Sequence, residues 1–140
     1  MIIVLTGPSI ADDSGLFHKK TSEILLPSFL SNGVTAHRGN SGEFPENTIL
    51  AIESGMEVGA DWIELDIIRS KDGQLVVIQD TTTKRVGDKN LVVAESTFDQ
   101  LAEADVASDF RRRTRKTVEE CLPQRIPLLK DVLLLAMQQN

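Results

Sequence analysis

Residues 62–80 read WIELDIIRSKDGQLVVIQD. The run from Trp62 to Ile68 is too short and too rich in β-branched residues to be anything but a strand. Asp72-Gly73 is a strong signal for a two-residue hairpin loop, and Gln74 to Ile78 follows it as a second strand. Because the connection has no room for a crossover helix, the strands are predicted to run antiparallel, as a β-hairpin over residues 62–79.

The hairpin predicts a cluster of polar side chains. If Asp72 and Gly73 form the loop, Asp66 lies directly opposite Gln79, and directly opposed residues share a face of the sheet. Glu64 is two residues from Asp66 and points to the same side, because side chains alternate along a strand. The buried face is then predicted to consist of Ile63, Leu65 and Ile67.

The segment before the hairpin has the pattern of a βα unit. Val34 to Ala36 is predicted to be a strand that leads into His37, and Pro45 is predicted to open a helix at about Glu46. The apolar face of this helix comprises Ile49, Ile52, Met56 and Ala60. Gly59 is its expected end. The order strand, helix, strand predicts a parallel sheet at this point.

Two pairs of residues in this region could carry chemistry. Glu64 and Asp66 on one strand face favour either a bound cation or an exposed acidic face, and carboxylate oxygens select Mg²⁺ or Ca²⁺. His37 ends a strand, where it could exchange protons near neutral pH, and Arg38 could grip a phosphate oxygen. A structural His-Arg pair is the alternative.

Four motifs occur in a characteristic order and spacing: His37-Arg38-Gly39, Pro45-Glu46-Asn47-Thr48, Glu64-Leu65-Asp66 and Val76-Val77-Ile78-Gln79-Asp80. Together they resemble the glycerophosphodiester phosphodiesterase family, whose members are metal-dependent enzymes on a phospholipase-C-like TIM barrel. The resemblance spans about Gly33 to Leu133. It implies an α/β fold and a partial (β/α)₈ TIM barrel, roughly the first half, because a complete barrel typically needs about 250 residues.

The resemblance also implies roles for single residues. By resemblance, His37 and Gln79 occupy catalytic positions, and Arg38 and Glu46 occupy substrate-binding positions. Glu64 and Asp66 occupy the positions that bind a divalent cation, Mg²⁺ or Ca²⁺. For Glu46, a carboxylate that stabilises the dipole at a helix N-terminus is an equal alternative. Gln79 stands where the family has its second catalytic histidine. Unlike histidine, an amide cannot gain or lose a proton near neutral pH.

The predicted domain organisation is an N-terminal extension, residues 1–32, followed by an incomplete glycerophosphodiester phosphodiesterase domain, residues 33–140. Within the extension, Met1 to Leu5 is predicted to be a strand, Thr21 to Leu30 a short helix, and His18 an exposed histidine without function. Later in the chain, Ser96 to Leu101 is predicted to be a capped short helix, and Leu128 to Met137 an apolar helix. Either the chain is shortened, or a partner or a second copy completes it.

Composition sets wider bounds. The chain has 140 residues, 41% of them hydrophobic and 26% charged, which is typical of a globular protein. Its net charge of −6 argues against nucleic-acid binding. No export signal is recognised, so a cytoplasmic location and no membrane contact are expected. The basic run from Arg111 to Lys116 is interpreted as a solvated helix face or loop, with contact to a membrane surface or polyanion as the alternative. Cys121 is predicted to be a small buried or half-buried apolar residue.

The sequence therefore predicts a metal-dependent phosphodiesterase that hydrolyses small-molecule glycerophosphodiesters to glycerol 3-phosphate and an alcohol, with activity weakened or lost through Gln79 and the short chain. The first alternative is a catalytically inactive barrel remnant that binds a phosphodiester or a metal. A non-functional gene remnant is the second.

Overall fold

The computed structural model describes residues 2–6 and 33–138. Its strands are β1 (Ile2–Thr6), β2 (Thr35–His37), β3 (Trp62–Arg69) and β4 (Leu75–Val77). Its α-helices are α1 (Ile49–Glu57), α2 (Phe98–Ala102), α3 (Ser108–Thr114) and α4 (Leu129–Gln138), and the short 3₁₀ turns are Thr83–Arg85 and Val93–Glu95. The α/β fold expected from the sequence is confirmed.

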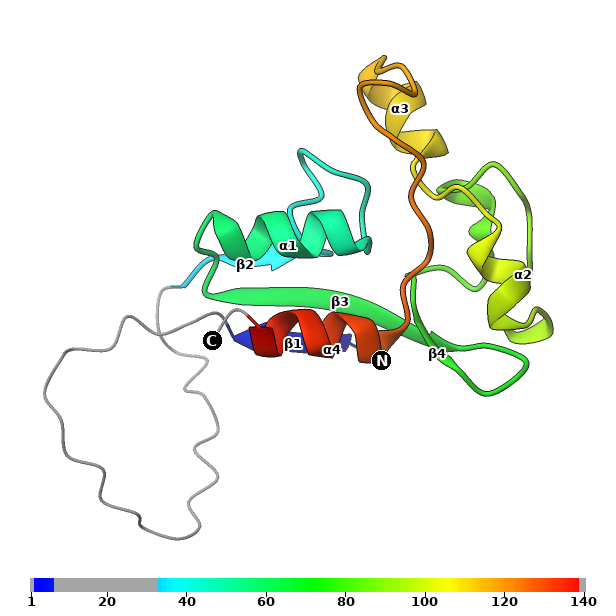
Figure 1. The fold of residues 1–140 in the computed structure, drawn as a ribbon, viewed down its shortest axis with the longest axis horizontal. Helices are drawn as coiled ribbons and strands as arrows, with labels where there is room; N and C mark the ends of the chain where they lie inside the picture. Colours follow the sequence, from blue (N-terminus) through cyan, green and yellow to red (C-terminus); the bar gives the residue numbers. More distant parts are fainter. Residues whose placement is uncertain (1, 7–32, 139–140) are drawn as a thin grey trace, which may run out of the picture.

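Strand β3 is the centre of the sheet (Figure 1). On one side it pairs in parallel with β2, with His37 opposite Glu64, which confirms the βα unit. On the other side it pairs antiparallel with β1, so the strand predicted at Met1 to Leu5 is also present, one residue later. The far end of β3 pairs antiparallel with β4, as the hairpin predicted.

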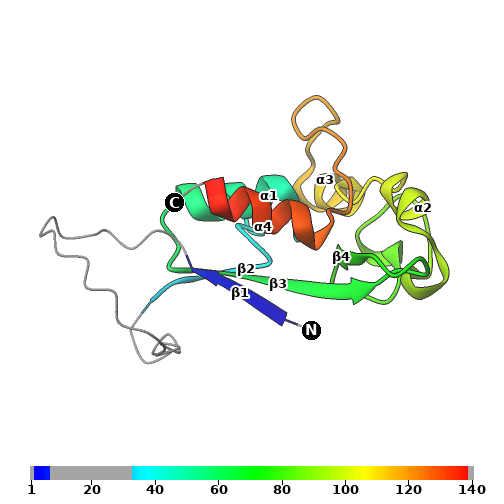
Figure 2. The same ribbon diagram turned by 60° about the horizontal axis from the view of Figure 1, so that its bottom comes forward.

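The two faces of β3 have different surroundings. Ile63, Leu65 and Ile67 are buried, as expected, beneath α1 and α4, which lie side by side on one face of the sheet (Figure 2). The apolar face of α1 is also confirmed, because Ile52 and Ala60 are buried in the same core. Each such side chain contributes roughly 1.5–3 kcal/mol by leaving water. This burial fixes Glu64 and Asp66 on the opposite face of the strand.

Helix α1 begins later than the sequence predicted. Its N-cap is Thr48, whose side-chain oxygen accepts a hydrogen bond from the Ala51 N–H, rather than a residue near Glu46. The reason is that Asn47 has a positive φ of 58°, a left-handed conformation that a helix cannot contain. The expected end is confirmed, with Gly59 just beyond the helix at a φ of 77°.

The predicted register of the hairpin is wrong by one residue. The observed pairs are Ile67 with Val77 and Ile68 with Val76, so Asp66 lies opposite Ile78 instead of Gln79. The loop has one residue more than predicted. The Gly73 N–H donates to the Ser70 carbonyl, 3.1 Å away, and Gly73 has a φ of 85°. A loop of this longer kind, with glycine in the left-handed position, is the next commonest hairpin connection.

The segment after the hairpin forms a second small core. It contains Val76, Ile78, Val86, Val93, Leu101, Val106 and Ile126. Helix α2 has the predicted cap, because Thr97 and Gln100 form a reciprocal capping box. Helix α4 lies within one residue of its prediction, and Cys121 is buried against Phe110, also as expected.

Some predictions fall outside the described residues, namely His18 and the helix at Thr21 to Leu30. The division into residues 1–32 and 33–140 stays a prediction. Among the helices that the structure describes, none has the length and apolar character needed to cross a membrane.

Gly39 offers a direct test of how the chain packs before the α1 helix. A Cβ at Gly39 would lie 2.5 Å from the Ala51 carbonyl carbon, and its φ is 75°. Gly73 has a similarly positive φ but open space around it. We expect Gly73→Ala to lower the free energy of unfolding by about 1–2 kcal/mol from backbone strain alone.

Gly39→Ala should cost roughly 2 kcal/mol more than this control, because the backbone itself must move. Urea denaturation of both variants measures the difference. Equal losses in the two variants would show that the contact between Gly39 and α1 is not a constraint.

Candidate active site

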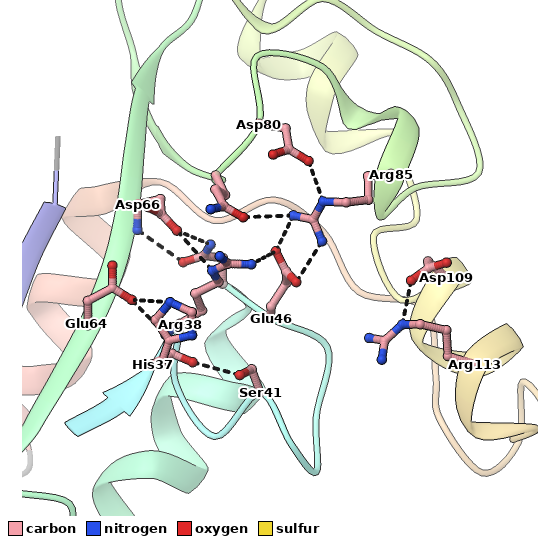
Figure 3. A network of polar contacts seen from close by, with 12 residues as sticks. His37, Arg38, Ser41, Glu46, Glu64, Asp66, Asp80, Arg85, Asp109 and Arg113 are labelled. Carbon is pink, nitrogen blue, oxygen red and sulfur yellow. Dashed lines mark hydrogen bonds and ion pairs between the residues drawn. The ribbon is translucent and has the colours of Figure 1, made fainter. Parts of the chain in front are cut away.

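The candidate site lies where the parallel strands β2 and β3 present polar side chains on the face opposite α1 and α4 (Figure 3). His37 is the last residue of β2, and its Nε2 lies 3.8 Å from Glu64 Oε2. The side chain of His37 is 64% exposed, whereas that of Glu64 is 12% exposed. The imidazole is therefore open to a ligand while the carboxylate behind it is held in place.

Arg38 connects the carboxylates of the site. Its backbone N–H donates to Glu64 Oε2 at 3.0 Å, which its positive φ of 57° permits. Its Nη1 donates to Glu46 Oε1 at 3.1 Å, and its Nε lies 3.5 Å from Asp66 Oδ2. That Nε is buried and has no hydrogen-bond acceptor among the described residues. A buried donor without an acceptor is costly, so this guanidinium is incompletely satisfied.

Asn47 holds the second carboxylate of β3. Its amide nitrogen donates to Asp66 Oδ2 at 3.1 Å, and its amide oxygen accepts from the Asp66 N–H at 3.3 Å. The left-handed backbone of Asn47 aims the amide at β3, a conformation that asparagine tolerates better than most residues. This reciprocal pair fixes both the position and the orientation of Asp66.

Arg85 closes the cluster from the 3₁₀ turn after the hairpin. It grips Glu46 with two parallel hydrogen bonds, Nη1 to Oε2 at 2.9 Å and Nη2 to Oε1 at 2.6 Å. Its Nε donates to Asp80 Oδ2 at 2.5 Å, and its Nη2 also donates to Gln79 Oε1 at 3.2 Å. Two-point Arg–carboxylate contacts of this kind are stronger and more directional than single hydrogen bonds.

The electrostatics of Glu46 follow from these contacts. Burial raises the pKa of Glu46, but the hydrogen bonds and charges of Arg85 and Arg38 outweigh burial and leave the pKa below its ordinary value. The hydrogen bonding that Arg85 donates to Glu46 is in turn the main cause that raises the pKa of Arg85. Glu46 is thus an ionised anchor between two guanidinium groups rather than a free acid or base.

The fold brings the six residues predicted for the site into one connected cluster. Gln79 reaches it in spite of the wrong register, because the chain leaves the ladder after Val77 and the Gln79 side chain meets Arg85. The α-helix N-terminus begins at Ile49, beyond Glu46, and the Glu46 carboxylate binds Arg38 and Arg85. That geometry does not match the alternative in which Glu46 stabilises a helix dipole.

Sequence reasoning missed three residues of the cluster: Asn47, Asp80 and Arg85. Two of them lie within the four motifs, Asn47 directly after Glu46 and Asp80 directly after Gln79. Their position next to predicted site residues was the signal that could have identified them. Arg85 lies in a polar stretch without a pattern, and no signal in the sequence pointed to it.

The comparisons with known proteins agree with this geometry. The Glycerophosphoryl diester phosphodiesterase family profile matches residues 37–140, a range that contains the whole cluster. The chain belongs to this family. Family membership accounts for the order of the four motifs.

Bacterial relatives match over a similar length of the chain. The chain is 37% identical over 107 residues to the Glycerophosphodiester phosphodiesterase of Bacillus altitudinis, covering 76% of this chain and 41% of the relative. It is 39% identical over 107 residues to the uncharacterised protein YqiK of Bacillus subtilis, with the same two coverages. The chain therefore spans about two fifths of the length of the curated relatives it matches.

Solved structures show the same partial match. The glycerophosphodiester phosphodiesterase of Agrobacterium tumefaciens superposes with a TM-score of 0.66 at 29% identity, over 76% of this chain and 43% of that one. An Oleispira antarctica phosphodiesterase, solved with the product sn-glycerol-3-phosphate, superposes with a TM-score of 0.65 at 27% identity. This match covers 76% of this chain and 40% of that one. The prediction of a partial TIM barrel is confirmed.

The contact between Arg85 and Glu46 predicts a measurable effect on stability. Arg85→Lys replaces the planar fork with a single ammonium group, and we expect a loss of about 1–3 kcal/mol in the free energy of unfolding near neutral pH. Arg125→Lys, at an exposed arginine elsewhere, is the matched control and should change stability by less than about 0.5 kcal/mol.

The pH dependence of the same variant has a defined sign. A carboxyl with a lowered folded-state pKa stabilises the fold above its unfolded pKa, and that contribution is lost as pH falls through the folded value. Removing the Arg85 fork raises the pKa of Glu46, so part of this contribution disappears and the acid-side decline flattens. Urea unfolding from pH 7 down to pH 3 measures this, and identical profiles for the variant and the wild type would contradict it.

Proposed function

We propose that this chain carries the first part of the active site of a phosphodiesterase that acts on small-molecule glycerophosphodiesters. The observation that carries the proposal is the convergence of His37, Arg38, Glu64 and Asp66 at one end of two parallel strands, in a chain of this family. The product of the reaction would be glycerol 3-phosphate with release of an alcohol. The Oleispira antarctica relative, solved with that product, supports this substrate class.

His37 is the proposed acid/base group. Its imidazole is 64% exposed, and its Nε2 lies 3.8 Å from Glu64 Oε2, close enough for the carboxylate to orient the ring. A histidine in this setting can take a proton from an attacking hydroxyl or give one to a leaving alkoxide. Arg38, next to it, is the proposed phosphate-binding residue, because its buried Nε has no acceptor among residues 2–6 and 33–138, and a phosphoryl oxygen could supply one.

A divalent cation fits the donor set of the site. Glu64 and Asp66 offer carboxylate oxygens from the same face of β3, which are the ligands that Mg²⁺ and Ca²⁺ prefer. Within the described residues, no group of three or more His, Cys, Asp or Glu is arranged to hold a metal. Mg²⁺ is often bound by one or two carboxylates together with water and substrate phosphate. When bound, the cation would neutralise charge on the phosphoryl oxygens.

Gln79 limits the proposed activity. Its amide oxygen accepts a hydrogen bond from Arg85, but the amide cannot donate or accept a catalytic proton near neutral pH. Loss of one general acid/base group typically lowers the rate by about 10²–10⁴. We therefore propose weak hydrolysis, and the alternative is an inactive barrel that retains phosphodiester or metal binding. The cytoplasmic location also stays a prediction from the sequence.

One assay tests the proposed function. We expect release of glycerol 3-phosphate from glycerophosphocholine in the presence of Mg²⁺ or Ca²⁺, and loss of that release when EDTA is added. Glu64→Gln should reduce release by at least about 100-fold, because it removes a metal ligand. Glu43→Gln, at an exposed carboxyl in the loop between β2 and α1, is the control and should leave release unchanged.

Substrate binding without release, in the wild type, would favour the inactive alternative. Release that survives both EDTA and Glu64→Gln would rule out the proposed metal site.

Gln79→His tests the role of the missing histidine. The new imidazole would stand beside Arg85 at the edge of the cluster and could supply the second proton transfer. We expect turnover of glycerophosphocholine to rise at least about tenfold. Gln74→His, the same change in the exposed hairpin loop, should have no effect. If Gln79→His is as slow as the wild type, the shortage of activity has a different cause.

A further inference from the structure

An open hollow lies next to the cluster, between the loop after β2 and helix α3. It measures about 520 Å³ and is lined by Ser41, Glu46, Arg85, Asp109, Arg112 and Arg113. A volume of this size is within the range of small-molecule sites. The side chains of Asp109 and Arg113 face the site across this space (Figure 3).

The hollow carries an excess of positive charge. Arg112 and Arg113 share one carboxylate, since both donate to Asp109, the latter from Nε at 2.7 Å. Each guanidinium has five N–H donors, and these bonds use one donor of each. Their side chains are 75% and 52% exposed, so the remaining donors are accessible.

The negative charge of Glu46 on the opposite wall does not cancel this excess. Both of its oxygens are bound by Arg85, and one also accepts from Arg38. Glu46 is thus occupied by the guanidinium groups on its own side of the hollow. The two arginines of α3, with a single carboxylate between them, leave one positive charge that an anionic ligand could pair.

The hollow and the candidate active site share a wall. Glu46 binds Arg38 of the site and lines the hollow, and Ser41 lines the hollow while its Oγ donates to the His37 carbonyl at 2.7 Å. A phosphodiester held between His37 and Arg38 would therefore have one arm directed past Glu46 toward α3. In a glycerophosphodiester, the glycerol arm is constant and the alcohol arm varies, so this contact would bear on the choice of alcohol.

We propose that Arg112 and Arg113 form a subsite for the alcohol arm of the substrate and that this subsite favours alcohols which themselves carry a phosphate. The inference rests on the proposed function, because it assumes that a phosphodiester occupies the neighbouring site. Guanidinium groups match the geometry of phosphate oxygens and bind them by two-point contacts. On this view the basic segment of α3 determines specificity and is more than a solvated helix face.

A matched pair of ligands tests the subsite. Glycerophosphoinositol and glycerophosphoinositol 4-phosphate differ only in one phosphate on the alcohol, and calorimetry with Mg²⁺ present gives their two dissociation constants. We expect the wild type to bind the phosphorylated ligand about tenfold more tightly at low salt, with the preference shrinking as salt is raised. The double change Arg112→Gln and Arg113→Gln should bring the ratio close to one.

Arg115→Gln is the control, because this arginine ends the same helix but does not line the hollow, and it should keep the wild-type ratio. A wild-type ratio near one, or a ratio that survives the double change, would overturn the proposal. So would binding to vesicles containing phosphatidylinositol 4-phosphate without binding of the soluble ligand, which would assign the arginines to a membrane surface.

The same ligands separate this proposal from the proposed function. Absence of glycerol 3-phosphate release with the affinity ratio retained overturns hydrolysis but supports the subsite, in a protein that binds and does not cleave. Release of glycerol 3-phosphate at equal rates from both ligands, with equal affinities, supports hydrolysis and overturns the subsite.

Discussion

The alternation of side chains along β3 is the constraint on which the rest of the structure depends. Burial of Ile63, Leu65 and Ile67 beneath two helices places Glu64 and Asp66 together on the opposite face. A slip of one residue would bury the two carboxylates and expose the apolar residues, at a cost of many kcal/mol. The hydrophobic core and the candidate site are therefore two consequences of one strand.

Carboxylates so close together need compensation, and the structure supplies it with guanidinium and amide groups. Arg38 and Arg85 hold Glu46 between them, and Asn47 pairs with both the backbone and the side chain of Asp66. Such a network limits the movement of its members. The Nε of Arg38 is the exception, since it is buried and has no hydrogen-bond acceptor in the part of the chain that the structure describes.

The site is built by segments that are distant in the chain. Residues 37–47 supply the histidine, the arginine and the anchoring glutamate, β3 supplies two carboxylates, and the turn at Thr83–Arg85 supplies the clamp. Arginines of α3 then border the hollow beyond Glu46. The match to about two fifths of a TIM barrel thus contains this cluster together with one flank of its surroundings.

Local patterns in the sequence determined the strand at residues 62–68, its two faces, the antiparallel hairpin and the family, because side-chain alternation and motif order need no distant contacts. The sequence did not predict the hairpin register or the start of α1 correctly. The register depends on the left-handed backbone of Gly73, and the helix start depends on that of Asn47. The sequence predicted that Gln79 belongs to the cluster, but only the tertiary structure showed that Arg85 clamps Glu46 and that Gln79 reaches the cluster through Arg85. The contact between Arg85 and Glu46 links residues 39 positions apart, and the one between Arg85 and Gln79, six positions apart, depends on where the chain leaves the sheet.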